Sequence, residues 1–199
     1  MAVFLRPLAA IALFAAGLTT AAQAEPKPYT LDKSHTAVTF TVDHLGYSLT
    51  HGFFTKFDAD IDFDPDAPEK SSVVFTIDAA SINTLWEPRD KHVRGKDFLD
   101  VENNADIVFR STSIEMTGDN TALLTGDLTM LGKTQEETFD VVLNKSAPSP
   151  LPQLNGKVVT GFTITGEIDR TVYGVTYASG AIGNVIPVQV SLEIYPADS

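Results

Sequence analysis

Apolar and polar residues alternate along most of this chain, with the period of a β-strand that buries one face. In residues 36–43, for example, Val38, Phe40 and Val42 share one face, and the opposite face is polar. The segments with the same alternation are 53–63, 73–79, 106–116, 121–131, 137–144, 158–168 and 185–194. The pattern therefore predicts an all-β fold of about eight strands.

Short turn sequences join most of these strands, which favours antiparallel neighbours. Residues 64–68 and 118–120 are rich in the Asp, Asn, Gly and Pro that turns require. Strands with polar outer faces connected in this way are typical of a closed barrel or a sandwich. An eight-stranded barrel has an interior that side chains fill, or that holds one small ligand.

Three details of the strand pattern are specific enough to test. Residues 53–63 are predicted as one long strand with Phe53 and Phe57 on its inward face and Phe54 on its outward face. Residues 25–29 contain two prolines and are predicted as an extended lead-in. Residues 146–156 contain three prolines and no periodicity, which predicts a loop.

One stretch, residues 85–100, interrupts the alternation with densely spaced charges and few apolar positions. Pro88 suits the first turn of a helix, and Asp90 and Arg94 would face each other four residues apart. A helix of about three turns is marginal alone and needs a larger body to hold it. We predict one short helix between strands three and four, acting as a lid or plug or simply as a surface connector.

The first residues have the features of an export signal. Arg6 precedes an apolar run, residues 8–18, that is too short to span a bilayer, and Ala22-Gln23-Ala24 supplies small residues for cleavage. We predict that residues 1–24 form a cleaved signal peptide and that 25–199 form one barrel domain. A buried N-terminal helix and an uncleaved anchor are the alternatives.

Charge and cysteine content narrow the setting. The chain has 14 Lys+Arg, 26 Asp+Glu and no Cys, and loss of Arg6 with the signal leaves 13 basic residues against 26 acidic ones. This acidity argues against nucleic acid as a partner, against electrostatic docking on anionic lipid, and for a soluble protein without stable membrane insertion. With the signal, it points to the bacterial periplasm, although the chain can form no disulfide there.

The aromatic residues suggest an apolar interior that could hold a ligand, although a solid core is the ordinary reading of such a pattern. The apolar candidates for ligand binding are Phe40, Val42, Phe53, Phe57, Phe75, Trp86, Leu99, Phe109, Phe139, Phe162 and Tyr177. The cations that could meet a polar end of the ligand are Arg89, His92, Arg94 and Arg170. Salt bridges to Asp90, Asp97 or Asp169 are the alternative role for these cations.

Several motifs, in this order, resemble the YceI-like family of exported, lipocalin-like barrels that bind polyisoprenoid lipids. They are Val38-Thr39-Phe40 with His44-Leu45-Gly46, Gly52-Phe53-Phe54, Ala80–Thr84, Arg89–Arg94 with Asp97–Glu102, Ile107–Ser111, and Thr125–Thr129 with Gly132. The resemblance implies an eight-stranded antiparallel barrel, a non-covalently bound polyisoprenoid of quinone or prenyl phosphate type, no further cofactor and no catalysis. Ala105, in place of a usual proline, and residues 168–174 depart from the family pattern.

Other functions remain as alternatives. Arg89, Asp90 and His92 near the cavity mouth could serve an enzyme acting on a small apolar substrate, although no Gly-x-Ser-x-Gly motif is present. The four histidines form no i, i+2 or i, i+4 pair, so the sequence predicts no metal site. A stress-related interaction protein would need no ligand, and an exposed strand edge could support a homodimer.

Overall fold

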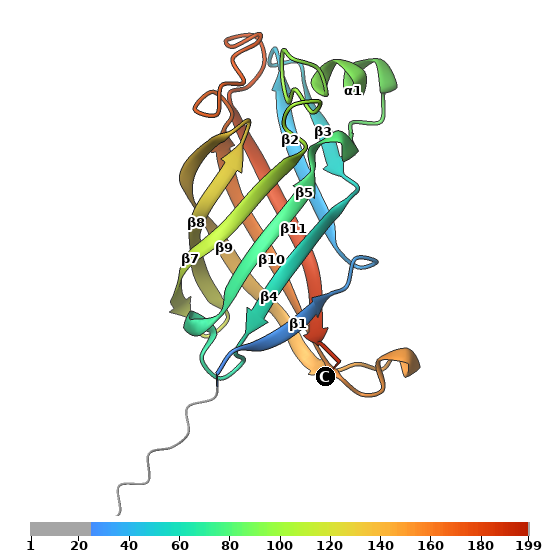
Figure 1. Cartoon of the computed structure of the whole chain (residues 1–199), viewed down its shortest axis with the longest axis vertical. Coiled ribbons are helices and arrows are strands. Elements are labelled where there is room, and N and C mark those ends of the chain that lie inside the picture. Colours follow the sequence, from blue (N-terminus) through green and yellow to red (C-terminus); the bar gives the residue numbers. More distant parts are fainter. Residues whose placement is uncertain (1–24, 199) are drawn as a thin grey trace, which may run out of the picture.

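The described residues, 25–198 of a computed structural model, form one antiparallel sheet that closes on itself (Figure 1). Its strands are β1 (Lys27–Leu31), β2 (Ala37–His44), β3 (Ser48–Phe54), β4 (Phe57–Phe63), β5 (Ser72–Asp78), β6 (Ile82–Asn83), β7 (Asp106–Gly118), β8 (Thr121–Met130), β9 (Lys133–Pro148), β10 (Val158–Asp169) and β11 (Val185–Pro196). The helices are α1 (Glu87–Val93) and the 3₁₀ turns η1 (Pro68–Lys70), η2 (Ala79–Ser81) and η3 (Pro152–Leu154).

These strands make an eight-membered ring, because the first three members are each broken into two strands. β1 and β2 both pair with β11, β4 pairs with β1, and β3 pairs with β2. β5 and β6 then pair with β4 and β3, and β5 to β11 complete the ring through β7, β8, β9 and β10. The predicted eight-stranded antiparallel barrel is confirmed. The position predicted for the helix, between strands three and four, is not exact, because α1 lies between β6 and β7.

The prediction of one strand over residues 53–63 is wrong, because Thr55 and Lys56 separate β3 from β4. The amide of Thr55 donates to Ser81 O and Asp78 N donates to Lys56 O, which holds this break in place. Because the chain leaves the regular strand for these two residues, the inward-facing positions of β3 and β4 do not belong to one continuous alternation. Phe54 therefore faces the interior, and Phe53 is 37% exposed on the outside.

Two other segments contribute more to the sheet than the sequence predicted. The extended lead-in becomes β1, which bridges β4 and β11 and closes one end of the barrel. The predicted loop begins later than expected, since β9 continues to Pro148 in register with Val158 of β10. In both segments the strand is held by backbone pairing with its neighbours, and the side chains do not alternate in a way that would predict it.

One end of the barrel, drawn at the bottom of Figure 1, is packed solid. Leu31, Leu192 and Ile194 are buried there against aromatic rings. The ring of Phe63 meets that of Phe162 edge-on at 5.7 Å, and Phe57 stacks on Phe75 at 5.8 Å. These ring contacts pack the interior at this end, which we call the closed end.

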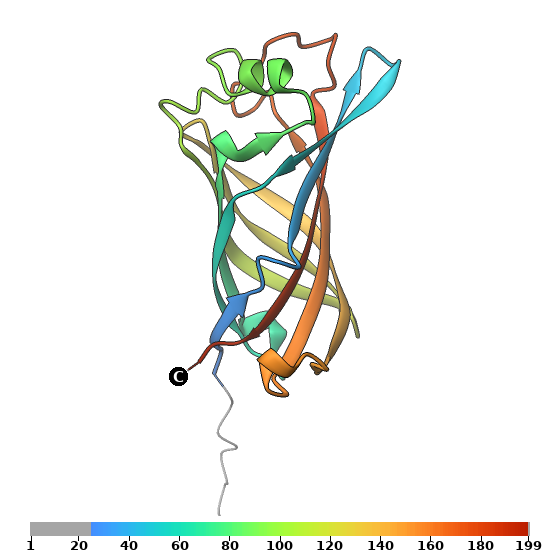
Figure 2. The same ribbon diagram turned by 90° about the vertical axis from the view of Figure 1, so that its right-hand side faces the viewer.

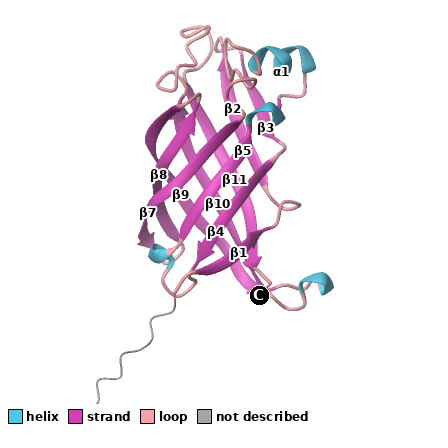
Figure 3. Ribbon diagram, viewed as in Figure 1, coloured by secondary structure: helices cyan, strands magenta, loops and turns pink. Residues whose placement is uncertain are grey.

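The opposite end carries the long connections. The β2–β3 hairpin, α1 with residues 94–105, and residues 170–184 gather there, as the two perpendicular views show (Figures 1 and 2). Figure 3 shows that strands build the wall and that the helical turns lie at its ends. None of the helices within residues 25–198 has the length and apolar character needed to cross a bilayer. The predicted signal peptide lies outside the described residues.

Candidate ligand-binding cavity

The half of the barrel away from the closed end contains a cavity of about 590 Å³. This size falls within the range of about 300–1,000 Å³ that is usual for ligand pockets. Of its 35 lining residues, seven have polar side chains: Thr39, His44, Thr50, Thr84, Arg89, His92 and Arg170. The lining is otherwise aliphatic and aromatic, so the cavity suits a long apolar molecule.

Most of the residues predicted to bind a ligand line this cavity. They are Phe40, Val42, Phe75, Trp86, Arg89, His92, Leu99, Phe109, Phe139, Arg170 and Tyr177. Phe53, Phe57 and Phe162 do not line it. Phe53 faces outward because of the break after β3, and Phe57 and Phe162 belong to the packed closed end.

The sequence reasoning missed other lining residues, notably Phe54 and the inward face of β11. Val188, Val190 and Leu192 showed the right alternation, but aliphatic strand residues carry no mark that separates a cavity wall from a core. Phe98 also lines the mouth. It follows a helix and lies in no strand, so side-chain alternation could not identify it.

The cavity stays open because aromatic rings lie against the wall over glycines of the neighbouring strand. Phe40 of β2 faces Gly52 of β3, and a Cβ at Gly52 would overlap the Phe40 ring. A Cβ at Gly126 would lie 2.6 Å from Phe109 Cζ, and one at Gly166 would lie 2.5 Å from Phe139 Cδ1. Glycine therefore supplies the room that lets these large rings line the interior without filling it.

Two basic side chains at the mouth, Arg89 and His92, each keep one nitrogen atom that could meet a ligand. Arg89 Nε donates to Thr84 Oγ1 at 2.6 Å and Nη2 donates to Thr84 O at 2.6 Å, and the guanidinium lies 5.7 Å from the centre of the Trp86 ring. His92 Nε2 pairs with Asp97 at 3.0 Å, as the salt-bridge alternative predicted. No hydrogen bond within residues 25–198 engages Arg89 Nη1 or His92 Nδ1.

Arg170 lines the cavity, and its guanidinium is engaged by the connection that follows it. It is 6% exposed, and its guanidinium donates to the carbonyls of Gly183, Val175, Tyr177 and Ile182 and to Asn184 Oδ1. Burial lowers the pKa of Arg170, while nearby Asp169 opposes that shift. These hydrogen bonds let the side chain hold residues 171–184 in shape.

Tyr173 attaches residues 171–184 to strand β9. Its side chain is fully buried, and its hydroxyl donates to Glu137 Oε1 at 2.6 Å. Burial, followed by the bond to Glu137, raises the pKa of Tyr173. Together with Arg170, this anchor places Tyr177 over the mouth, where its ring meets those of His92 and Phe98 at 5.1 and 5.2 Å.

The helix is attached through Asp90 and Arg94, which do not pair with each other as predicted. The buried carboxylate of Asp90 accepts hydrogen bonds from the amide and the hydroxyl of Thr84. Arg94 instead donates to Glu87 and to the carbonyls of Ala80 and Ile82. These bonds tie α1 to the turn before it, so the helix is held over one side of the mouth.

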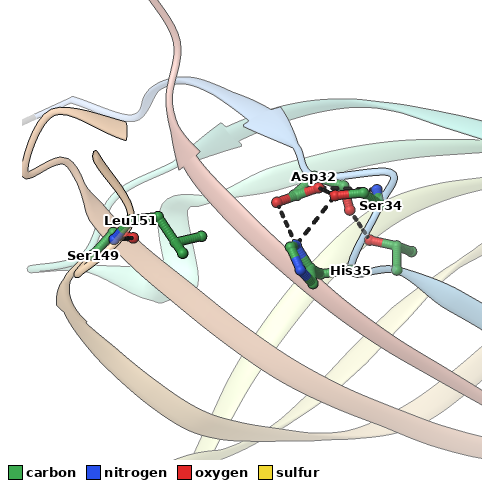
Figure 4. A network of polar contacts seen from close by, with 6 residues as sticks. Asp32, Ser34, His35, Ser149 and Leu151 are labelled. Atoms are coloured by element: carbon green, nitrogen blue, oxygen red, sulfur yellow. Dashed lines mark hydrogen bonds and ion pairs between the residues drawn. The ribbon is translucent and has the colours of Figure 1, made fainter. Parts of the chain in front are cut away.

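Among the described residues, one group of potential metal ligands lies outside the cavity, where Asp32, His35 and Glu193 come within 4.8 Å of one another. His35 Nδ1 and Asp32 Oδ2 are already hydrogen-bonded at 2.8 Å, and Ser34 donates to the same carboxylate (Figure 4). Figure 4 also draws the separate Ser149–Leu151 turn, in which Leu151 N donates to Ser149 Oγ at 3.2 Å. These bonds explain the cluster as a brace for the β1–β2 connection.

Comparison with known proteins decides the family. The model of the YceI-like domain matches residues 29–194, which include all the strands but the first two residues of β1 and the last two of β11. This chain belongs to the YceI-like family. A "UPF0312 protein" of Pseudomonas putida strain F1 is 37% identical over 190 residues, which is 94% of this chain and 96% of that one.

Solved structures agree with the fold. A Campylobacter jejuni YceI protein is 30% identical, with a TM-score of 0.71 over 86% of this chain and 99% of its own. A polyisoprenoid-binding domain of Saccharophagus degradans, implicated in plant cell wall breakdown, has a TM-score of 0.58 over 85% of this chain and 98% of its own. At 13% identity, that second likeness speaks for the fold alone.

Proposed function

We propose that this YceI-like protein binds a polyisoprenoid lipid of quinone or prenyl phosphate type and transports, stores or sequesters it. The observation that carries the proposal is the apolar cavity, kept open by rings that lie over glycines. A polyisoprenoid-binding domain shares this fold, so a barrel of this kind is able to hold such a ligand. The predicted signal peptide supports a periplasmic setting.

The energetics of such a ligand fit an interior of this kind. An isoprenoid tail has no polar atom to satisfy, and burial of each CH₂ contributes about 0.8 kcal/mol before the costs of association. The polar head would stay at the mouth, where Arg89 Nη1 can donate to a phosphate or quinone oxygen and His92 lies beside it. The end of the tail would lie against the packed rings of the closed end.

The hydrogen bonds of Asp90 favour binding over catalysis as the role of this site. Asp90, the acid of the possible catalytic group, is buried and accepts two hydrogen bonds from Thr84. A general base must reach the proton that it removes, and a carboxylate held in this way faces the helix attachment. A ligand-free interaction protein would have no use for the cavity.

The test is to identify what the exported protein contains. Native mass spectrometry and solvent extraction should release a lipid of several isoprene units, close to one per barrel. Ile164→Trp should lower this occupancy because Ile164 lines the cavity, and Glu167→Trp on the exposed face of β10 is the matched control. Repeated recovery of an empty barrel from a host rich in isoprenoids would overturn the proposal.

A further inference from the structure

The most exposed apolar side chains of this barrel gather at its open end. Among residues 25–198, five large apolar residues are more than half exposed: Leu45 at 53%, Tyr47 at 87%, Leu49 at 60%, Leu85 at 78% and Trp86 at 59%. The first three lie on the β2–β3 hairpin and the other two on the approach to α1. We call these five residues the rim. Four of them lie outside the lining of the cavity, so ligand packing does not account for them.

Two rim leucines also occupy backbone positions that suit other residues. Leu45 has φ 57° and precedes Gly46 with φ 72°, and the amide of Tyr47 donates to His44 O. Positive φ at both central residues is the geometry of a type I′ turn, in which Asn-Gly is strongly preferred. Leu85 has φ 65°, again a conformation that leucine rarely adopts.

Both leucines are therefore unfavourable in two respects: each adopts a backbone conformation that leucine rarely takes, and each exposes an apolar side chain to water. A sequence that keeps such residues without a packing partner is expected to do so at a functional site. Leu45 lies in the β2–β3 hairpin and Leu85 directly before α1, and these two separate connections lie at the same end of the barrel as the mouth (Figure 2).

The charges at this end do not oppose contact with lipid. The connections at the mouth, residues 44–48, 79–105, 131–133 and 170–184, hold six Lys or Arg and five Asp or Glu. The rest of residues 25–199 holds seven Lys or Arg and 21 Asp or Glu. Four of these acidic residues lie at strand ends that adjoin the mouth: Asp43, Asp78, Asp106 and Asp169. Since charges are screened over about 8 Å at physiological ionic strength, most of the acidic surface is too distant to matter at the rim.

We propose that the rim docks on the interface of a lipid bilayer, so that the mouth faces the phase from which an apolar ligand is exchanged. This inference rests on the proposed function for its purpose, although docking itself is measured separately. Trp and Tyr favour the level of the lipid headgroups, and leucines reach into the acyl boundary below them. The interaction depends on apolar burial, so zwitterionic lipid is sufficient.

The experiment uses the chain from Glu25, which carries the whole closed barrel and omits the apolar residues 8–18. It is mixed with phosphatidylcholine vesicles and assayed by flotation and by fluorescence of Trp86, the only tryptophan. We expect co-flotation, a blue shift of the emission, and little change with salt. The double variant Leu45→Asn/Leu85→Asn should bind about tenfold more weakly, since each leucine loses its apolar burial.

This variant keeps the fold, because Asn suits positive φ, and a thermal melt checks that it does. Leu151→Asn, at an exposed leucine of the closed end, is the matched control and should float like the parent. Absence of flotation, or equal flotation of the double variant, would overturn the docking inference. A Trp86 shift without flotation means ligand uptake without docking, and it contradicts this inference alone. Flotation of a barrel that never yields an extractable lipid contradicts the carrier proposal alone.

Discussion

At the scale of single residues, the mouth depends on buried polar side chains more than on its exposed charges. Arg170 was predicted as a ligand contact because a cation near a cavity mouth suits a phosphate. The structure shows its guanidinium bonded to four carbonyls and one side-chain amide. Which role an arginine takes depends on where the backbone of residues 175–184 returns, and no local pattern in the sequence records that path.

Arg170→Lys should destabilise the protein strongly although it keeps the positive charge. Lysine cannot reproduce the planar fork, so several buried carbonyls lose their donor, at about 3–5 kcal/mol in total. For a chain of this size that corresponds to a fall of about 6–20 °C in Tm. Thermal unfolding measures it, with the exposed Arg110→Lys as control. A fall of less than 2 °C would show that the carbonyls find other partners.

The His35–Asp32 pair should make stability depend on pH. The hydrogen bond that His35 donates to the Asp32 carboxylate raises the pKa of His35. For Asp32, burial acts to raise the pKa, but hydrogen bonds from Ser34 and His35 lower it overall. The His35 contribution is full below about pH 6.5, its unfolded value, and is lost as pH rises through the higher folded pKa. The Asp32 contribution is present above about pH 3.9 and is lost as pH falls through the lower folded pKa.

The destabilisation caused by His35→Gln should therefore be largest between about pH 4 and 6.5 and should shrink in alkaline solution. Urea unfolding at a series of pH values measures it. His51→Gln, at an exposed histidine of β3, controls for the general effect of losing an imidazole. A His35→Gln effect that is constant from pH 5 to 9 would contradict a role for this pair.

At the scale of elements, the cavity depends on how each ring lies against the next strand. Gly52→Val should force the Phe40 ring into the cavity, because a side chain at this site overlaps it. Overpacking of this kind costs about 1–3 kcal/mol and should lower ligand occupancy while the barrel remains closed. Circular dichroism and native mass spectrometry measure the two effects.

Gly161→Val is the matched control for this change. The nearest atoms to a Cβ at Gly161 are 3.8 and 3.9 Å away, which is ordinary contact. It should therefore leave occupancy unchanged. Equal loss in both variants would mean that valine disturbs these strands generally, and the specific role of Gly52 would be wrong.

The sequence predicted the elements well where side-chain alternation is the cause of the structure. Val38, Phe40 and Val42 alternate because β2 has one face toward the interior, and α1 stands out because its residues do not alternate. The pattern failed at Thr55 and Lys56, where hydrogen bonds to Ser81 and Asp78 interrupt the strand. Those partners lie more than 20 residues away in the chain, so the inward face of β3 could not be read from its own residues.

At the scale of the whole molecule, the barrel joins a packed end to a hollow end within one continuous sheet. Phe57 and Phe162 looked equivalent to Phe40 and Phe109 in the sequence, since all four alternate inward. Their height in the barrel separates them: the first two pack around Leu31 and Ile194, and the others lie over glycines. The ring of paired strands makes stability a property of both halves together.

A ligand in the hollow half should therefore stabilise the entire barrel. Binding to the folded state alone adds RT ln(1 + [L]/Kd), about 2.7 kcal/mol when the free ligand is at 100 times Kd. At about 2–4 °C for each kcal/mol, this corresponds to about 5–11 °C. Solvent extraction followed by refolding should lower Tm by this amount, and adding a polyisoprenoid alcohol should restore it in one cooperative transition.

Ile164→Trp provides the control, because the tryptophan partly fills the cavity and the Tm of this variant should respond little to extraction or to added lipid.

The closed end sets a further expectation, since a tail can enter from the mouth only. Lipids whose tails exceed the depth of the cavity should leave their excess length at the rim and add no further stability. A Tm that rises steadily with tail length would mean that the packed rings of Phe63 and Phe162 open to admit the chain.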